Sequence, residues 1–322
     1  MCSNNECCLD LLSTEEDTMK SFALLSAIVA LAAASPFAYP RQPLCNANAE
    51  ACNTKYSNIS YIGTHNSAFV GDRDDPRVNQ EQSVTQQLDA GIHFLQAQTH
   101  KDVWGTLSMC HTDCWLMDAG SLENYLSTVK SWMDDHPNAL ITMLLGNGDN
   151  VDVTEFADAF DRANLKHYAF IPPTSPEKLE IEDWPTLGEM IGDGTRLVMF
   201  LDYGADEMKV PYIMPEFKYF FETPYSTDDL DQCKIDRPSD ATADGRMYIV
   251  NHVLSEEITD DLIIPEEDAI SDTNAATGPG SIGAHVKLCH EVHDRTPNFV
   301  LVDFFNRGDW LPAQQAMNDF IR

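Results

Sequence analysis

Tyr61-Ile62-Gly63-Thr64-His65-Asn66-Ser67 is the stretch that decides the fold, because a short apolar strand is followed at once by a histidine. In (β/α) barrels the catalytic side chains lie at the carboxyl ends of the parallel strands. A second short run, Leu107-Ser108-Met109-Cys110, ends in the same way at His111. We therefore expect two facing imidazoles, which can act as a general base and a general acid.

Short β-type runs alternate with amphipathic helical runs from Cys45 to the end of the 322-residue chain. This alternation is typical of parallel strands joined by helices. It predicts one α/β domain, a single irregular TIM (β/α)8-type barrel, over residues 45–322. The eight expected strands are 60–64, 92–97, 106–110, 139–145, 196–202, 219–222, 247–251 and 298–304. The expected helices are 83–90, 121–135, 153–163, 186–191, 282–292 and 311–320.

Two segments, 222–245 and 255–280, are rich in Asp, Thr, Pro and Gly. This composition predicts loops. Both are long for connections in a compact domain, so they are candidates for lid or rim segments.

The beginning of the chain has the composition of a targeting segment. Residues 19–34 contain Lys20, an apolar run of about 13 residues and then small residues, which is typical of a secretory signal peptide. A membrane helix needs ~20 apolar residues, so an anchor is not expected. The acidic residues 1–18 either precede the true start at Met19 or form a disordered extension. We therefore predict a secreted, extracellular protein.

Three of the nine cysteines lie before residue 19, and six remain after the signal peptide. An even number of cysteines in a secreted chain favours disulfides, with metal ligation as the weaker alternative. Spacing favours the pairs Cys45–Cys52, Cys110–Cys114 and, from what remains, Cys233–Cys289. Asn58-Ile59-Ser60 is a sequon for N-glycosylation.

The chain has 52 acidic and 20 basic residues, and its formal charge is −32 at pH 7. Nucleic acid is therefore excluded as an expected partner, because its binding depends on Lys and Arg that neutralise phosphates. A site for a phosphate group in such a chain needs local hydrogen-bond donors or a cation. The acidity agrees with an extracellular environment of low pH.

Asp303 follows the apolar run 299–302, which is expected to be a buried strand. A buried carboxylate is costly unless it has a partner. A histidine N–H across the barrel is a natural partner, whose tautomer Asp303 would fix as the aspartate of a catalytic triad does. A cap to a nearby backbone amide is the alternative.

Polar side chains follow other expected strands and are candidates for contact with a substrate. For two of them, Asn147 and Tyr203, the alternative is an ordinary turn over 147–150 or 202–204. The expected substrate-binding residues are Asn66, Gln96, Gln98, Asn147 and Tyr203.

The motif Gly63-Thr64-His65-Asn66-Ser67, the segment 88–95 and the strand ending in His111 together resemble the X domain of phosphatidylinositol-specific phospholipases C. The closest likeness is to secreted phospholipase-C-like phosphodiesterases. The order of motifs continues through 137–141, 196–200 and 298–303, so that the resemblance covers most of residues 45–322. It implies an irregular TIM barrel with His65 as general base and His111 as general acid. It further implies that Asp303 orients the first histidine.

The resembling enzymes stabilise the charge of the transition state with calcium held by carboxylates, or with an arginine after the second strand. Here those positions are Gln96 and Gln98, and Gly146-Asn147 replaces an acidic position. Calcium prefers more carboxylate oxygens than these residues supply. A divalent cation therefore stays open as a cofactor, and no metal ligand is assigned. The alternative cations are Arg73, Lys101 and Arg307.

We expect a secreted phosphoric diester hydrolase that cleaves a lipid or head-group phosphodiester by two-histidine acid–base catalysis. Its contact with a membrane surface would be at most transient. The alternative is a catalytically degenerate barrel that binds a glycan or lipid head group, which Gln96 and Gln98 favour. A glycosidase is a third option on fold alone, without a convincing carboxylate pair at the strand ends.

Overall fold

The computed structural model describes residues 44–225, 227, 229–259 and 262–320. The expected extension at 1–18 and the signal peptide at 19–34 lie outside the described residues. The described residues of the expected barrel fall within one compact unit. None of the described helices is both long enough and apolar enough to cross a bilayer.

Eight parallel strands form the central sheet in the order β7-β6-β5-β2-β1-β12-β9-β8. Their bounds are β1 Tyr61–Thr64, β2 Phe94–Lys101, β5 Ile141–Asn147, β6 Leu197–Leu201, β7 Ile213–Pro215, β8 Phe220–Glu222, β9 Met247–Asn251 and β12 Phe299–Val302. Within the described part of the chain no ladder joins β7 to β8, so the barrel is open at that edge. The prediction of an irregular α/β barrel is confirmed.

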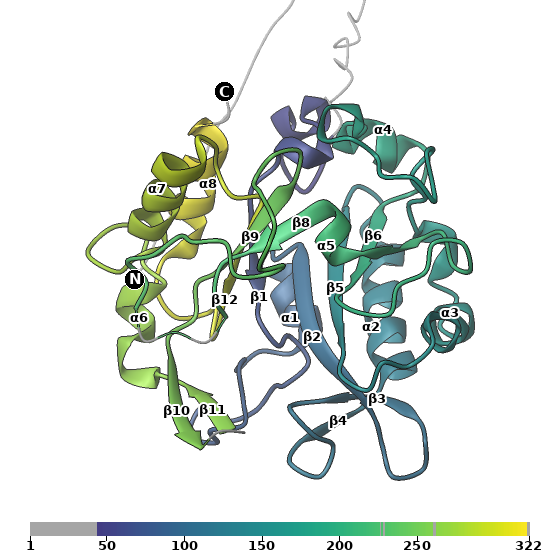
Figure 1. Cartoon of the computed structure of the whole chain (residues 1–322), viewed down its shortest axis with the longest axis horizontal. Coiled ribbons are helices and arrows are strands. Elements are labelled where there is room, and N and C mark those ends of the chain that lie inside the picture. Colours follow the sequence, from purple (N-terminus) through teal and green to yellow (C-terminus); the bar gives the residue numbers. More distant parts are fainter. Residues whose placement is uncertain (1–43, 226, 228, 260–261, 321–322) are drawn as a thin grey trace, which may run out of the picture. The chain divides into compact units, whose positions relative to one another are not determined.

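Helices cover the outside of the sheet. Figure 1 shows α2 and α3 on one side of the central strands and α7 and α8 on the other. The helices are α1 Val84–Asp89, α2 Leu122–Asp135, α3 Val153–Arg162, α4 Leu187–Gly192, α5 Glu216–Tyr219, α6 Ile270–Thr273, α7 Ile282–His293 and α8 Trp310–Phe320. α2 begins where Ser121 caps it, since the hydroxyl accepts a hydrogen bond from the amide of Asn124. Its apolar stripe is buried against the sheet, as the helical spacing predicted.

The strands bury side chains on both faces, because alternate residues point to opposite sides of a sheet. Leu95 and Val300 pack toward the helices, whereas Phe94 and Phe299 lie in the other cluster and stack with ring centroids 4.2 Å apart. Gly63 pairs with Phe94, and a Cβ at Gly63 would come within 2.4 Å of that ring. The glycine of the opening motif is therefore required by close packing.

The prediction of a parallel barrel strand at 106–110 is wrong. β3, Leu107–Cys110, runs antiparallel to β2 and pairs in turn with β4, Asp118–Ser121. The eighth parallel strand is instead β7, which contains only three residues. β2 extends beyond its parallel neighbours to Lys101, and its free end is what β3 pairs with. An apolar run predicts a strand but does not give the direction of its partner.

The segment 255–280 is also not a simple loop. It contains the antiparallel hairpin of β10, Ser255–Thr259, with β11, Leu262–Pro265, followed by α6. The segment 222–245 is a loop as expected, and a bridge between Glu222 and Arg237 holds it to the end of β8.

The three expected disulfides are confirmed. Cys110–Cys114 closes the turn after β3, where His111 lies. Cys233–Cys289 joins the loop 222–245 to α7, and Cys45–Cys52 closes a short segment before β1. Two of the three bonds therefore fix segments that border the carboxyl ends of the strands.

Candidate functional site

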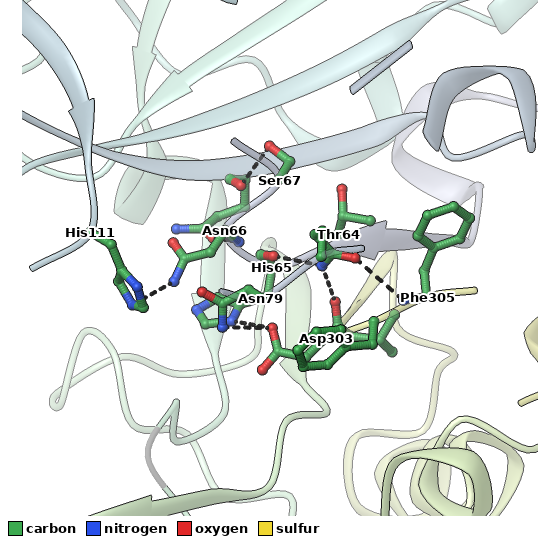
Figure 2. A network of polar contacts seen from close by, with 12 residues as sticks. Thr64, His65, Asn66, Ser67, Asn79, His111, Asp303 and Phe305 are labelled. Atoms are coloured by element: carbon green, nitrogen blue, oxygen red, sulfur yellow. Dashed lines mark hydrogen bonds and ion pairs between the residues drawn. The ribbon is translucent and has the colours of Figure 1, made fainter. Parts of the chain in front are cut away.

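The register of two neighbouring strands brings His65 and Asp303 together. β1 pairs with β12 in parallel so that Thr64 lies opposite Val302, and the next residue of each strand is His65 or Asp303. His65 Nδ1 lies 2.8 Å from Asp303 Oδ1 (Figure 2), and the carboxylate is 7% exposed. Since a carboxylate accepts, Nδ1 carries the proton and Nε2 is left as the basic nitrogen.

Asn79 contacts the same carboxylate oxygen of Asp303 as His65 does. Its Nδ2 donates to Asp303 Oδ1 at 3.0 Å, and its backbone carbonyl accepts from the amide of Phe304. Gln80 donates to the carbonyl of His65 at 2.8 Å. The segment after β1 therefore fixes both members of the pair, which reduces the freedom that His65 would lose on binding a substrate.

His111 lies close to Asn66, with its Nε2 3.3 Å from Asn66 Nδ2 (Figure 2). Its Nδ1 donates to the carbonyl of Arg77 at 2.7 Å, and its Nε2 accepts from Asn66 Nδ2 at 3.3 Å. The ring stacks on Phe69 with centroids 4.8 Å apart. Burial lowers the pKa of His111, and the nearby His65 lowers it further against the opposing effect of the Arg77 carbonyl.

Asn66 connects the two histidines. Its backbone is left-handed, with φ of 49°, a conformation that asparagine tolerates better than most residues. Its amide N–H donates to Gln96 Oε1 at 2.8 Å, while its side-chain Oδ1 is buried and has no hydrogen-bond partner among the described residues. The left-handed turn is what directs the side chain of Asn66 to His111 just after the backbone has presented His65.

The side-chain amide oxygens of Gln96 and Gln98 accept hydrogen bonds from backbone N–H groups. Gln96 Oε1 accepts from Asn66, and Gln98 Oε1 accepts from the amide of Thr112 at 3.0 Å. Their NH2 groups are therefore the donors that they can offer to a ligand. Among the described residues no three His, Cys, Asp or Glu side chains gather as a metal site would require. Gln96 and Gln98, which lie within β2, thus do not fit calcium.

The other two expected substrate contacts lie beside the site. Asn147 donates to the carbonyls of Val151 and Tyr203 and accepts from the amide of Val151, so its side chain is fully used within a turn. Tyr203 is half exposed and packs against Phe217 with centroids 5.5 Å apart. Both arrangements favour the turn alternative.

A cavity of about 240 Å³ opens at the carboxyl ends of the strands and includes His65 in its wall. Its polar lining combines expected and unexpected residues. Besides His65, these include Gln96, Gln98, His100, Asp202, Glu216, Glu222, Arg237 and Asn251.

Sequence reasoning missed Glu216, Glu222 and Arg237. Glu222 ends the expected strand 219–222, so the rule that found His65 could have found it, whereas Glu216 follows β7, whose three residues form too short a pattern. No sequence pattern indicated Arg237, because it lies in a loop and reaches Glu222 only through a β-bridge between that loop and β8. Arg237 supplies the permanent positive charge of the cavity. Two of the expected cations, Lys101 and Arg307, instead pair with Glu155 and Glu81.

The unexpected residues form a buried acidic cluster. Glu222 Oε2 accepts from Arg237 Nε at 3.0 Å and from Asn251 Nδ2 at 3.3 Å. Burial and then the neighbouring Glu222 raise the pKa of Glu216 well above its usual range. Burial also raises the pKa of Asp202, whose Oδ1 accepts two backbone N–H groups. Such shifts are typical of functional sites, although ion-pair networks produce them too.

A family model and two fungal proteins are similar to this chain over most of its length. The PI-PLC X family model (PI-PLC X 1) matches residues 51–318. "PI-PLC X domain-containing protein 1" of Arthroderma benhamiae is 48% identical over 94% of this chain and 98% of its own length. "Uncharacterized secreted protein" of the same fungus is 41% identical over 82% of this chain and 61% of its own length.

Two solved bacterial structures share the fold at low sequence identity. Phosphatidylinositol-specific phospholipase C from Listeria monocytogenes has a TM-score of 0.52 and 16% identity, over 84% of this chain and 94% of its own. A mutant of the enzyme from Staphylococcus aureus has a TM-score of 0.55 and 12% identity, over 83% and 94% of the two chains. At these identities the likeness concerns the fold alone.

Proposed function

Because this chain belongs to the PI-PLC X family and has a phospholipase-C-like barrel, we propose that it is a secreted phosphodiesterase that cleaves a lipid or head-group phosphodiester. The observation that carries the proposal is the 2.8 Å contact between His65 Nδ1 and Asp303 at the ends of adjacent parallel strands. A histidine held in this way presents its basic nitrogen to the cavity that it lines.

In the proposed reaction His65 acts as the general base. Its Nε2 takes the proton of the attacking hydroxyl, whose oxygen forms a bond to phosphorus. The bond from phosphorus to the leaving oxygen breaks, and His111 protonates that oxygen. Gln96, Gln98 and Arg237 are the donors available for the charge that develops on the phosphoryl oxygens.

His111 can act as the acid only when its Nε2 carries a proton. Asn66 Nδ2 donates to this nitrogen in the neutral state, whereas no residue that the structure describes forms a hydrogen bond with Asn66 Oδ1. Half a turn of the amide would exchange the two atoms, and Oδ1 would then accept from the protonated ring. Asn66 is therefore proposed to serve both protonation states of His111 as a positioning residue.

Secretion is part of the proposal. Three disulfides support it, because such bonds form and persist in oxidising compartments. Asn58 is exposed at the end of a short helix, Tyr56–Asn58, as an N-glycosylation site should be. The net charge of −32 opposes lasting contact with anionic membranes or nucleic acid, so any contact with a lipid surface is proposed to be transient.

The test is hydrolysis of phosphatidylinositol, phosphatidylcholine and a soluble phosphodiester by the full chain, with calcium and with a chelator. His65→Ala is expected to lower kcat at least about 100-fold, the usual effect of a general base. His167→Ala, at an exposed position outside the cavity, is the matched control. Equal activity of wild type and His65→Ala would refute the mechanism. Since Gln96 and Gln98 do not fit calcium, the chelator should have no effect.

A binding barrel without turnover is the second candidate. The observation that favours it is that both ring nitrogens of His111 are engaged in hydrogen bonds within the protein. It predicts a wild-type chain that binds a head group but hydrolyses none of the three substrates.

Glycoside hydrolysis is not favoured, although Glu216 and Glu222 form a carboxyl pair that the sequence had not indicated. The two catalytic carboxyl groups of glycosidases are about 5 to 9.5 Å apart. Glu222 is instead held in an ion pair with Arg237, while burial and then this neighbouring carboxyl group raise the pKa of Glu216.

A further inference from the structure

We propose that the cavity beside His65 selects a positively charged head group, so that the substrate is a phosphodiester of an alkylammonium alcohol. The inference rests on the proposed function for the position of the phosphodiester and adds the chemical class of its head group. Three observations carry it: an acidic side chain without a donor, the charge of the lining, and the way in which Arg237 is engaged.

Glu216 is the first observation. It follows β7 directly, is 1% exposed and lines the cavity. Neither of its carboxyl oxygens accepts a hydrogen bond from a described residue, and its polar neighbour is the carboxyl group of Glu222. A buried carboxyl group without donors is costly unless a ligand supplies one. The cavity is therefore built to receive a donor or a cation at this point.

The charge of the lining is the second observation. Glu222 and Arg237 neutralise each other in an ion pair. Burial and the neighbouring Glu222 raise the pKa of Glu216 well above its usual range. Asp202 is an acidic group with which no lysine or arginine of the lining forms an ion pair. A monovalent cation balances this charge, a neutral polyol leaves it unbalanced, and an anion adds to it.

Arg237 is the third observation. Its guanidinium group is tied to Glu222 through Nε and Nη2 and lies 4.8 Å from the ring centroid of Tyr225. These contacts hold the hydrogen-bond donors of Arg237 on Glu222 and not on Asp202 or Glu216. Tyr225 also lines the cavity, and an aromatic ring attracts cations.

Cation binding should release a proton. The ionisable groups that act on Glu216 are Glu222, Arg237 and Asp202. The lining also contains His65 and His100, the latter in contact with Asp149 at 3.0 Å. A cation placed against Glu216 favours its ionised form, so the proton leaves as the ligand enters. A neutral polyol has no such effect, which makes proton release a signature of the proposed ligand.

The experiment is isothermal titration of the full chain with choline and with myo-inositol, in two buffers of different ionisation enthalpy. We expect choline to bind at least about tenfold more tightly than myo-inositol, with release of a proton that the buffer comparison detects. Glu216→Gln should abolish the proton release and weaken choline binding about tenfold, the effect of one charge-assisted contact.

Two further variants serve as a control and as a replacement if the first variant does not fold. Glu207→Gln changes another buried glutamate, which pairs with Lys218 outside the cavity, and should leave choline binding unchanged. If Glu216→Gln does not fold, Asp202→Asn takes its place, since its amide oxygen can still accept the two backbone N–H groups. Asp202→Asn should weaken choline binding about tenfold while proton release persists.

The inference is overturned if myo-inositol binds as tightly as choline, or if choline binds without releasing a proton. It is equally overturned if choline binding survives the change at Glu216 or, where that variant does not fold, at Asp202. Binding does not require turnover, so the two proposals can fail separately. A chain that binds choline but hydrolyses no phosphodiester contradicts the proposed function alone. A chain that hydrolyses phosphatidylinositol but does not bind choline contradicts this inference alone.

Discussion

The two histidines of the site differ in how far water reaches them. The side chain of His65 is 21% exposed and lines the cavity, whereas His111 is 7% exposed and stacks on the ring of Phe69. Burial is the main reason that the pKa of His111 lies below the usual 6.5. A general acid with a lowered pKa transfers its proton more readily, but a smaller fraction of it is protonated at neutral pH.

Hydrolysis should therefore be faster at acidic pH than at neutral pH. Because His111 must be protonated to act, kcat/KM is expected to fall as the pH rises through its lowered pKa, below 6.5. Phe69→Leu removes the stacked ring and admits water, which should move this limb of the profile to higher pH. Phe160→Leu, at a buried position on α3, is the control and should leave the limb in place. A limb that lies above pH 6.5 in the wild type would contradict the assignment of His111.

At the scale of elements, the hairpin of β2 and β3 is what brings His111 to the site. β3 returns antiparallel along the free end of β2 and delivers His111 beside Asn66 rather than at the end of a barrel strand. Cys110–Cys114 closes the turn that follows. His111 thus depends on a disulfide-closed turn, whereas His65 and Asp303 are fixed by the ladder of β1 and β12.

Removal of this disulfide should affect activity more than stability. In Cys110→Ser/Cys114→Ser the turn after β3 is released, and we expect kcat to fall about tenfold because a small displacement of the acid slows proton transfer. The loop that the bond closes is short, so its entropic effect on unfolding is modest. Cys45→Ser/Cys52→Ser, which opens the short segment before β1, is the matched control. Thermal melting and kcat should be measured for both, and equal losses of activity would contradict the role of the turn.

The elements also explain which parts of the site the sequence could predict. His65 and Asp303 follow apolar runs of four residues, and the rule for carboxyl ends holds for both because β1 and β12 are parallel neighbours. The same rule wrongly predicted a parallel strand at 106–110, because composition does not determine the direction in which a strand pairs. β7 has three residues and ends in a proline, so its pattern is too short to recognise. Arg237 enters the cavity from a loop through a long-range bridge that no local pattern records.

At the scale of the whole molecule, acidity acts on stability in two opposite ways. Protonation of surface carboxylates at low pH reduces the mutual repulsion of a chain with charge −32. Buried histidines act against this, because burial lowers the pKa of His93 to about 4 and that of His252 to about 3. Added salt separates the two effects, since it screens exposed charges far more than buried ones.

The buried histidines predict a loss of stability at mildly acidic pH in high salt. Below pH 6.5 the unfolded chain binds protons that the folded chain does not, so the free energy of unfolding declines as the pH falls toward the folded pKa values. For His93, whose pKa moves from 6.5 to about 4, the decline is about 3 kcal/mol. His93→Phe keeps a ring beside Tyr61 and should flatten the slope by about that amount. Urea unfolding between pH 4 and 7 in 0.5 M salt, about the strength needed for screening, measures the effect. An unchanged slope in His93→Phe would assign the pH dependence to other groups.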